Sequence, residues 1–205
     1  MAVDEGPRPA GRGPVRIDVV TTRGGDRGET SLASGVRVSK SSVRIDALGE
    51  LDEANAVLGL LATSLVGAQG RLDEVRHLQA LLFDVGALVC QPGAAAPADM
   101  GAEAVAWIEA ATQSLQIRQA ALTSFILPGG SQPSAWAHLA RTVVRRAERA
   151  VVRVTQTEPG SVPSDVALIL NRMSDYLFVL GRHLNEDGRA DILWQPRARS
   201  RPDGA

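Results

Sequence analysis

The chain has 205 residues, a formal net charge of -1, 44% hydrophobic residues and only 3% aromatic residues. This length is enough for one well-buried core, and the near-zero charge argues against nucleic acid or an anionic membrane as a partner of the whole molecule. Few aromatic residues among many Ala, Val and Leu favour close-packed helices over a β-sandwich. The predicted fold class is therefore all-α.

The single cysteine and the apolar runs indicate where the protein is located, and the composition of the two chain ends indicates the bounds of the domain. Cys90 is the only cysteine, so no internal disulfide can form, and no apolar run reaches the roughly 18 residues that span a bilayer. We therefore expect a cytoplasmic protein without a membrane partner. Residues 1–16 are rich in Gly, Pro and Arg and are predicted to be a disordered arm. Residues 196–205 are predicted to be a flexible tail, which leaves residues 17–195 as the domain.

Five segments have the 3.6-residue apolar period of a helix: residues 44–66, 69–90, 102–124, 133–155 and 164–186. Pro133 suits the first turn of the fourth helix, and Ser164 is expected to cap the fifth. Helices of about 20 residues joined mostly by short loops predict a five-helix bundle. Residues 17–40 lack this period because glycines interrupt them, so we predict a long loop there, either functional or disordered.

The glycine-rich loop contains residues 22–31, TRGGDRGETS, and is followed by Lys40, the only lysine in the chain. Glycines let backbone N–H groups approach phosphate oxygens closely. The segment is not a Walker A motif, since no Gly-Lys-Ser/Thr follows the glycines. We interpret it as a phosphate-binding loop, and the alternative is a plain flexible loop.

The predicted fourth helix has a basic stripe along one face. At 100° per residue, that face carries Arg141, Arg145, Glu148 and Arg149, and the opposite face carries Trp136, Val143, Ala147, Val151 and Val154. Guanidinium groups keep their charge and can bind phosphate oxygens through two parallel hydrogen bonds. The stripe therefore indicates a polyanion site, and the alternative is a solvated face held by i,i+4 pairs.

Residues 125–131, FILPGGS, come directly before this helix. A tight turn at Gly129 and Gly130 is an unusual way to connect two helices, so Phe125 could be an apolar wedge beside the anion site. The alternative is that Phe125 is an ordinary core residue.

Two further helices have polar stripes. On the fifth helix, Asn171, Ser174, Asp175, Phe178 and Arg182 share a face that could bind a ribose, brace arginines or simply face solvent. On the first helix, Asp52 could pair with an arginine of the fourth helix, within one subunit or between two.

Metal and nucleophile chemistry have little support. His77, His138 and His183 lie far apart without the spacing of a metal site. Cys90 is interpreted as a packing residue rather than a nucleophile, and no catalytic triad spacing is present.

Together these segments resemble the PduO-type ATP:cob(I)alamin adenosyltransferases. The matching motifs occur in the family's order and spacing at residues 22–32, 37–40, 49–55, 78–79 with 82–86, 125–130, 145–149 and 170–178. The resemblance thus covers most of the predicted domain.

The resemblance implies a homotrimer of five-helix bundles, with ATP and Mg²⁺ held between neighbouring subunits and cobalamin bound base-off. The implied ATP-binding residues are Thr22, Arg23, Gly24, Gly25, Asp26, Gly28, Thr30, Ser31, Lys40, Arg145, Arg146, Glu148, Arg149 and Asn171. The implied catalytic residues are Phe125, Asp52, Arg141 and Arg145. In this scheme Arg145 is the main cation on the triphosphate, Asp52 and Arg141 form a salt bridge between subunits, and Phe125 shields the lower face of the corrin ring. Mg²⁺ is implied to enter with ATP rather than on protein side chains.

The implied reaction transfers the 5′-deoxyadenosyl group of ATP to cob(I)alamin, which forms adenosylcobalamin and releases triphosphate. The product could pass to an adenosylcobalamin-dependent mutase. One alternative is a carrier that binds ATP or a corrinoid without turnover. Another is a helical scaffold or nucleic-acid module that uses the arginine stripe, which the near-zero net charge disfavours.

Overall fold

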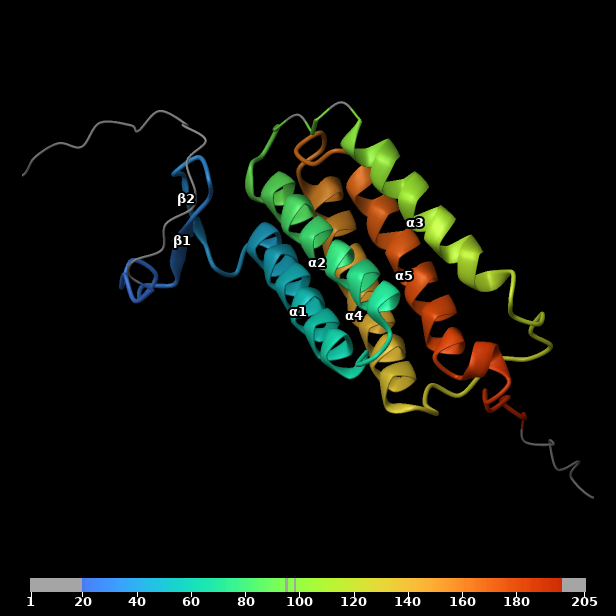
Figure 1. Ribbon diagram of the computed structural model, residues 1–205. Helices are drawn as coiled ribbons and strands as arrows, with labels where there is room; N and C mark the ends of the chain where they lie inside the picture. The colour runs from blue at the N-terminus through green and yellow to red at the C-terminus, as the bar shows by residue number, and fades with distance from the viewer. Residues whose placement is uncertain (1–19, 95, 98, 197–205) are drawn as a thin grey trace, which may run out of the picture.

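The computed structural model describes residues 20–94, 96–97 and 99–196. Within these ranges it contains a hairpin of strands β1 (Glu29–Ser31) and β2 (Arg37–Ser39), and the helices α1 (Val43–Ser64), α2 (Gln69–Cys90), α3 (Met100–Gln116), α4 (Gln132–Thr157) and α5 (Asp165–His183), followed by the 3-10 turn η1 (Glu186–Gly188). Figure 1 shows the helices side by side, with the hairpin beyond the first turn of α1. The predicted five-helix bundle is confirmed. The predicted arm lies outside the described residues, as does the predicted tail after Pro196.

Helix α4 lies at the centre of the packing, because it contacts both α1 and α5, while α2 packs on α1 and α3 on α5. Its predicted apolar face is confirmed: Val143, Ala147, Val151 and Val154 are at most 4% exposed. Burying this face on its neighbours directs the opposite face of α4, with its arginines, away from the core. Within the described part of the chain, no helix is both long and apolar enough to cross a membrane.

Two predicted helix ends are wrong. The third helix ends at Gln116, not near residue 124, because the following segment is held against the end of α5. There Gln119 Nε2 donates to the carbonyl of Val179 at 2.8 Å, and Arg182 donates to the carbonyl of Ala120 at 3.1 Å. The fifth helix ends at His183, and Ser164 does not cap it, since its backbone is already helical and its side chain makes no capping bond.

The predicted loop at residues 17–40 contains strands that the glycine pattern did not reveal. Glu29 pairs with Ser39, Thr30 with Val38 and Ser31 with Arg37, all antiparallel. Each strand has three residues, which is too short for a clear two-residue period in the sequence. The prediction of a wholly α-helical chain is corrected at this hairpin.

A buried tyrosine connects α5 to α2. Tyr176 is fully buried, and its hydroxyl donates to the carboxylate of Glu74 at 2.5 Å. Burial, followed by this hydrogen bond, raises the pKa of the Tyr176 phenol well above its usual range. Tyr176 therefore remains a hydrogen-bond donor at any physiological pH.

Replacing Tyr176 with phenylalanine should lower the free energy of unfolding by about 1–3 kcal/mol, because it removes a hydrogen bond to a charged group and leaves Glu74 without this donor. Urea unfolding of Tyr176→Phe, Glu74→Gln and the double variant measures the coupling between the two side chains. A double variant whose loss equals the sum of the single losses would show that the contact contributes nothing.

Candidate functional site

The glycine-rich loop and Lys40 form one compact unit. The backbone N–H of Lys40 donates to the carbonyl of Gly28 at 2.8 Å. Its ammonium lies against Gly25, because a Cβ atom added there would be 2.8 Å from Nζ. Arg37, from the second strand, donates to the carbonyl of Gly24 at 2.8 Å and pairs with Glu29. The loop is therefore held beside the only lysine, and its role in binding phosphate stays a prediction.

Four of the five arginines of α4 divide into two groups, and the fifth, Arg141, belongs to neither. Arg146 pairs with Glu50 and Glu53 of α1, and Arg153 pairs with Asp46. These two arginines join helices. The structure therefore favours a bracing role for Arg146 over the predicted contact with ATP.

Arg145 and Arg149 make up the second group, the cationic patch. Both are exposed, and neither has a carboxylate partner among the residues that the structure describes. Arg149 donates only to the carbonyl of Arg145, at 3.1 Å, which brings two like charges onto adjacent turns. Two neighbouring cations without an anion are suited to a ligand with several negative charges.

The polar stripe of α5 contacts α4 at Glu148, which lies next to Arg149 in the sequence. Asn171 donates to Glu148 at 3.2 Å and accepts from Arg172 at 2.9 Å. The idea that the whole stripe faces solvent is wrong, since Ser174 is 2% and Arg182 7% exposed. Asn171 and Glu148, which the resemblance assigns to one nucleotide pocket, are thus in contact.

Asp52 and Arg141 do not pair within one chain. Asp52 is exposed on α1, and Nε of Arg141 has no hydrogen-bond partner among the described residues. Burial, followed by the charge of Arg145, lowers the pKa of the Arg141 guanidinium. Neither group has an oppositely charged partner among the described residues, so a salt bridge between two copies of the chain stays a prediction.

Phe125 is not a core residue. Its side chain is 79% exposed and lies in the wall of an apolar pocket of about 700 Å³. The lining residues are Leu122, Thr123, Ser124, Phe125, Ile126, Arg141, Phe178 and Trp194. Arg141 connects this pocket to the cationic patch, because Arg145 follows it by one helical turn.

Trp194 is a pocket residue that the sequence analysis missed. Its ring lies edge-on to Phe125 with centroids 6.3 Å apart. It stands two residues before Pro196, where the predicted tail begins, in the apolar triplet Ile192-Leu193-Trp194. Three consecutive apolar residues there were a sequence signal that this segment packs against the rest of the domain.

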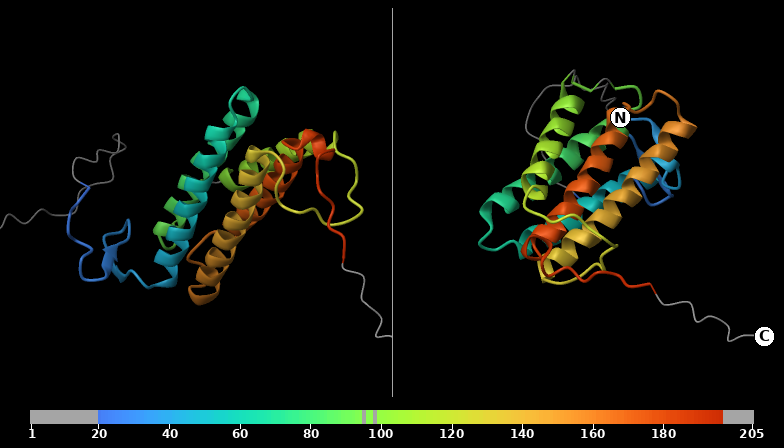
Figure 2. Two further views of the ribbon diagram at one scale, coloured as in Figure 1. Left: turned by 90° about the horizontal axis from the view of Figure 1, so that it is seen from below. Right: turned by 90° about the vertical axis from the view of Figure 1, so that its right-hand side faces the viewer.

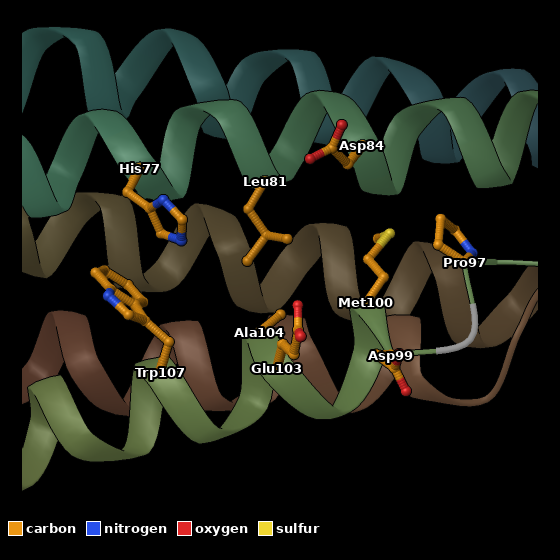
Figure 3. Close-up of a pocket in the computed structure, with 9 residues that line it drawn as sticks. All are labelled: His77, Leu81, Asp84, Pro97, Asp99, Met100, Glu103, Ala104 and Trp107. Atoms are coloured by element: carbon orange, nitrogen blue, oxygen red, sulfur yellow. The ribbon is translucent and has the colours of Figure 1, made fainter.

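A second cavity, of about 670 Å³, lies between α2 and α3 and is shown in Figure 3. Its wall includes His77, whose ring lies 4.2 Å from that of Trp107, and the carboxylates Asp84, Asp99 and Glu103. None of the predicted site residues lines it. The cavity is thus separate from the candidate site.

The two predicted halves of the nucleotide site do not meet in one chain. Figure 1 and Figure 2 both show the hairpin beyond the end of α1, clear of the middle of α4. Within residues 20–94, 96–97 and 99–196, no hydrogen bond or ion pair joins residues 22–40 to the cationic patch. One chain therefore has the predicted phosphate-binding loop at one place and the cationic patch at another.

His138 lies behind the Phe125 pocket, in contact with its wall. It is 2% exposed, and neither ring nitrogen has a hydrogen-bond partner among the described residues. Its ring lies edge-on to Phe178 at 6.1 Å. Burial, followed by the charge of Arg141, lowers the pKa of the imidazole.

The free energy of unfolding should therefore decrease as the pH falls below about 6.5, because the unfolded chain binds a proton at His138 that the folded protein still excludes. The loss has a limiting slope of about 1.4 kcal/mol per pH unit and stops below the lowered pKa. Urea unfolding at about pH 7.5 and about pH 5.5 checks this, with His138→Leu losing less than the wild type. His77→Gln, at an exposed site, is the control and should behave as the wild type does. An equal loss in His138→Leu would contradict the assignment.

Comparison with known proteins gives consistent matches over most of the chain. Residues 20–184 match the model of the family described as cobalamin adenosyltransferase. A cobalamin adenosyltransferase from Cupriavidus metallidurans is 42% identical over 183 residues, which cover 88% of this chain and 96% of the relative. Corrinoid adenosyltransferase MMAB from Homo sapiens is 36% identical over 197 residues, or 89% of this chain and 76% of the relative.

A solved structure has a similar fold. It is a variant PduO-type ATP:corrinoid adenosyltransferase from Lactobacillus reuteri complexed with cobalamin and ATP. The TM-score is 0.80 at 30% identity, and the match covers 86% of this chain and 97% of that chain. The family match over residues 20–184 includes the glycine-rich loop, Phe125 and the cationic patch, and it ends before Trp194.

Proposed function

The chain belongs to the cobalamin adenosyltransferase family and is an ATP:corrinoid adenosyltransferase, and from this premise we propose that it transfers the 5′-deoxyadenosyl group of ATP to cob(I)alamin. The electron pair of cobalt(I) forms the new bond to the 5′-carbon, and the pair of the broken C5′–O bond leaves with triphosphate. The products are adenosylcobalamin and triphosphate.

The observation that carries this proposal is that an open apolar pocket adjoins the cationic patch. Phe125 and Trp194 stand exposed in the pocket wall, and Arg141 connects it to Arg145. An apolar pocket directly beside a cationic patch is what a flat macrocycle and a nucleoside triphosphate need when they bind next to each other. The apolar side suits the corrin ring, and the patch suits the phosphates.

The cationic patch would hold the leaving group. Triphosphate gains charge as the C5′–O bond breaks, so cations placed beforehand stabilise the transition state more than the substrate. Arg145 and Arg149 supply two such charges, and Lys40 with the backbone of its loop supplies more. Mg²⁺ is proposed to enter on the phosphates, as no three His, Cys, Asp or Glu side chains gather in the described part of the chain.

Phe125 would keep the lower face of the corrin free of water and of an axial base. A cobalt(II) centre without a lower ligand is easier to reduce to cobalt(I), so an apolar side chain at this place favours formation of the nucleophile. The exposure of Phe125 supports this role, because a ring that stabilised only the fold would be buried. This chemistry requires no protein nucleophile or general base.

We propose that the complete site lies between subunits of a homotrimer. The loop of one copy would meet the cationic patch of the next, and Asp52 would pair with Arg141 across the same interface. The separation of the two halves in one chain supports this arrangement (Figure 1). The exposure of Phe83, 72% on α2 beside Asp52, also supports an interface on that side.

An anaerobic assay tests the reaction. The protein is mixed with ATP and cobalamin that a strong chemical reductant has converted to cobalt(I), and adenosylcobalamin and triphosphate are both measured. The proposal expects equal amounts of the two products over many turnovers. ATP binding without triphosphate release would instead identify a carrier.

A further inference from the structure

The end of the described chain is fixed to the segment that carries Phe125. The backbone N–H of Trp194 donates to the carbonyl of Phe125 at 2.7 Å, and that of Leu127 donates to the carbonyl of Ile192 at 2.9 Å. Ser124 adds a side-chain bond to the carbonyl of Trp194 at 2.7 Å. Figure 1 shows the two segments at one end of the bundle, after α5 and before α4. Trp194 is therefore placed by backbone pairing and not by chance contact.

A buried polar cluster holds this pairing in place. The carboxylate of Asp191, 2% exposed, accepts from Arg182 at 2.8 Å and from Asn185 at 3.2 Å. Asn185 also donates to the carbonyl of Gly129 and accepts from the backbone N–H of Ser131, both at 3.0 Å. The cluster thus joins the end of α5, the chain end and the turn before α4. Buried groups paired this completely limit the movement of the segments that they join.

The paired segments, residues 124–127 and 192–194, leave their aromatic side chains exposed on the side of the pocket. Trp194 is 45% exposed and Phe125 is 79% exposed, although the backbone on which both stand is hydrogen bonded. Two neighbouring aromatic rings face a cavity of about 700 Å³ and form an exposed apolar surface that stability of the fold does not require. Exposed aromatic rings on a hydrogen-bonded backbone are typical of a pre-formed binding site.

We propose that Trp194 contacts the bound corrinoid and forms, with Phe125, a continuous aromatic wall of its pocket. The inference rests on the proposed function, because it adds a residue to the corrinoid side of that site. A corrin offers a broad apolar surface that aromatic side chains cover well. Trp194 and Phe125 meet edge to face, so their two rings present surfaces at an angle of 61° to each other.

Kinetics of Trp194→Ala and Trp194→Phe test the contact. Trp194→Ala should raise the KM for cob(I)alamin about tenfold, because a large apolar contact is lost. The KM for ATP should not change, and Trp194→Phe should recover most of the loss. Trp136→Phe, on α4 and outside the pocket, is the matched control and should leave both KM values unchanged.

Hydroxyl-radical footprinting of the wild-type protein gives a second readout that does not depend on a variant folding. Oxidation of Trp194 should fall several-fold when hydroxocobalamin is added to the protein with ATP, while oxidation of Trp136 stays constant. Protection that is already complete without hydroxocobalamin would overturn the proposal, because Trp194 would then be covered by another copy of the chain.

The outcomes separate this inference from the proposed function. If the wild type turns over but Trp194→Ala keeps its KM for cob(I)alamin, only the role of Trp194 fails. If the wild type makes no adenosylcobalamin, the proposed function fails.

Discussion

Phe125→Ala should leave the affinity for ATP nearly unchanged and should remove most of the activity that starts from cobalt(II) under weak reduction. The ring is exposed in the apolar pocket and is separated from Arg145 by Arg141, so its loss does not alter the cationic patch. Without it, water or an axial base can reach the lower face of the corrin and make reduction harder. Effects of this kind are worth about 1–5 kcal/mol, which corresponds to roughly a fivefold to several-thousandfold loss.

The comparison of two starting states makes this prediction specific. With cobalt(I) formed in advance, Phe125→Ala should lose far less activity than with cobalt(II). The electron paramagnetic resonance spectrum of bound cobalt(II) should regain the signature of an axial ligand. Leu127→Ala, in the same segment and 49% exposed, is the matched control. An equal loss from both starting states would contradict the wedge role.

Arg145→Ala should weaken ATP binding about tenfold to a hundredfold, because hydrogen bonds between charged groups contribute about 1.5–3 kcal/mol. Arg145 is exposed and has no carboxylate partner in the described part of the chain, so its removal frees no buried charge. Arg145→Lys should recover part of the affinity, since it keeps the charge but loses the guanidinium fork.

Calorimetric titration with ATP and Mg²⁺ measures the effect. Arg153→Ala is the control, because Arg153 lies on the same helix and is half exposed but pairs with Asp46. Its affinity should match the wild type. Unchanged affinity in Arg145→Ala would contradict the phosphate role, and an equal loss in Arg153→Ala would indicate that the helix itself had been disturbed.

The helices could be predicted from the sequence because their signal is local. The apolar period of α4 places Val143, Ala147 and Val151 on one face, and burial follows that pattern. The hairpin was missed because strands of three residues leave too few positions to show alternation. The C-terminal part of the third predicted helix was wrong because contacts to α5, distant in sequence, hold that segment in another conformation.

The candidate site was predicted only in part, because several of its features depend on contacts between residues distant in sequence. The basic stripe could be read along one helix, but its division into helix-joining and free arginines depends on the carboxylates of α1, which no local pattern identifies. The exposure of Phe125 and the position of Trp194 depend on a pairing between segments about 70 residues apart. Contacts of this range require the folded structure.

We propose that one nucleotide site is built from two copies of the chain, with the loop and Lys40 from one copy and the cationic patch from the next. Tests on a single variant cannot separate this from a site within one chain. A variant of the loop or of the cationic patch should lose activity whether the site is shared between copies or lies within one chain. A mixture of two damaged chains distinguishes them.

The most direct measurement is therefore the activity of mixed oligomers of Lys40→Ala and Arg145→Ala chains, unfolded together in equal amounts and refolded. Each variant alone should be nearly inactive. If the two chains assemble at random, about a quarter of all the interfaces in the refolded mixture combine an intact loop with an intact arginine, so activity should return to about a quarter of that of refolded wild type. Mixed oligomers that stay as inactive as the separate variants would contradict a site shared between subunits.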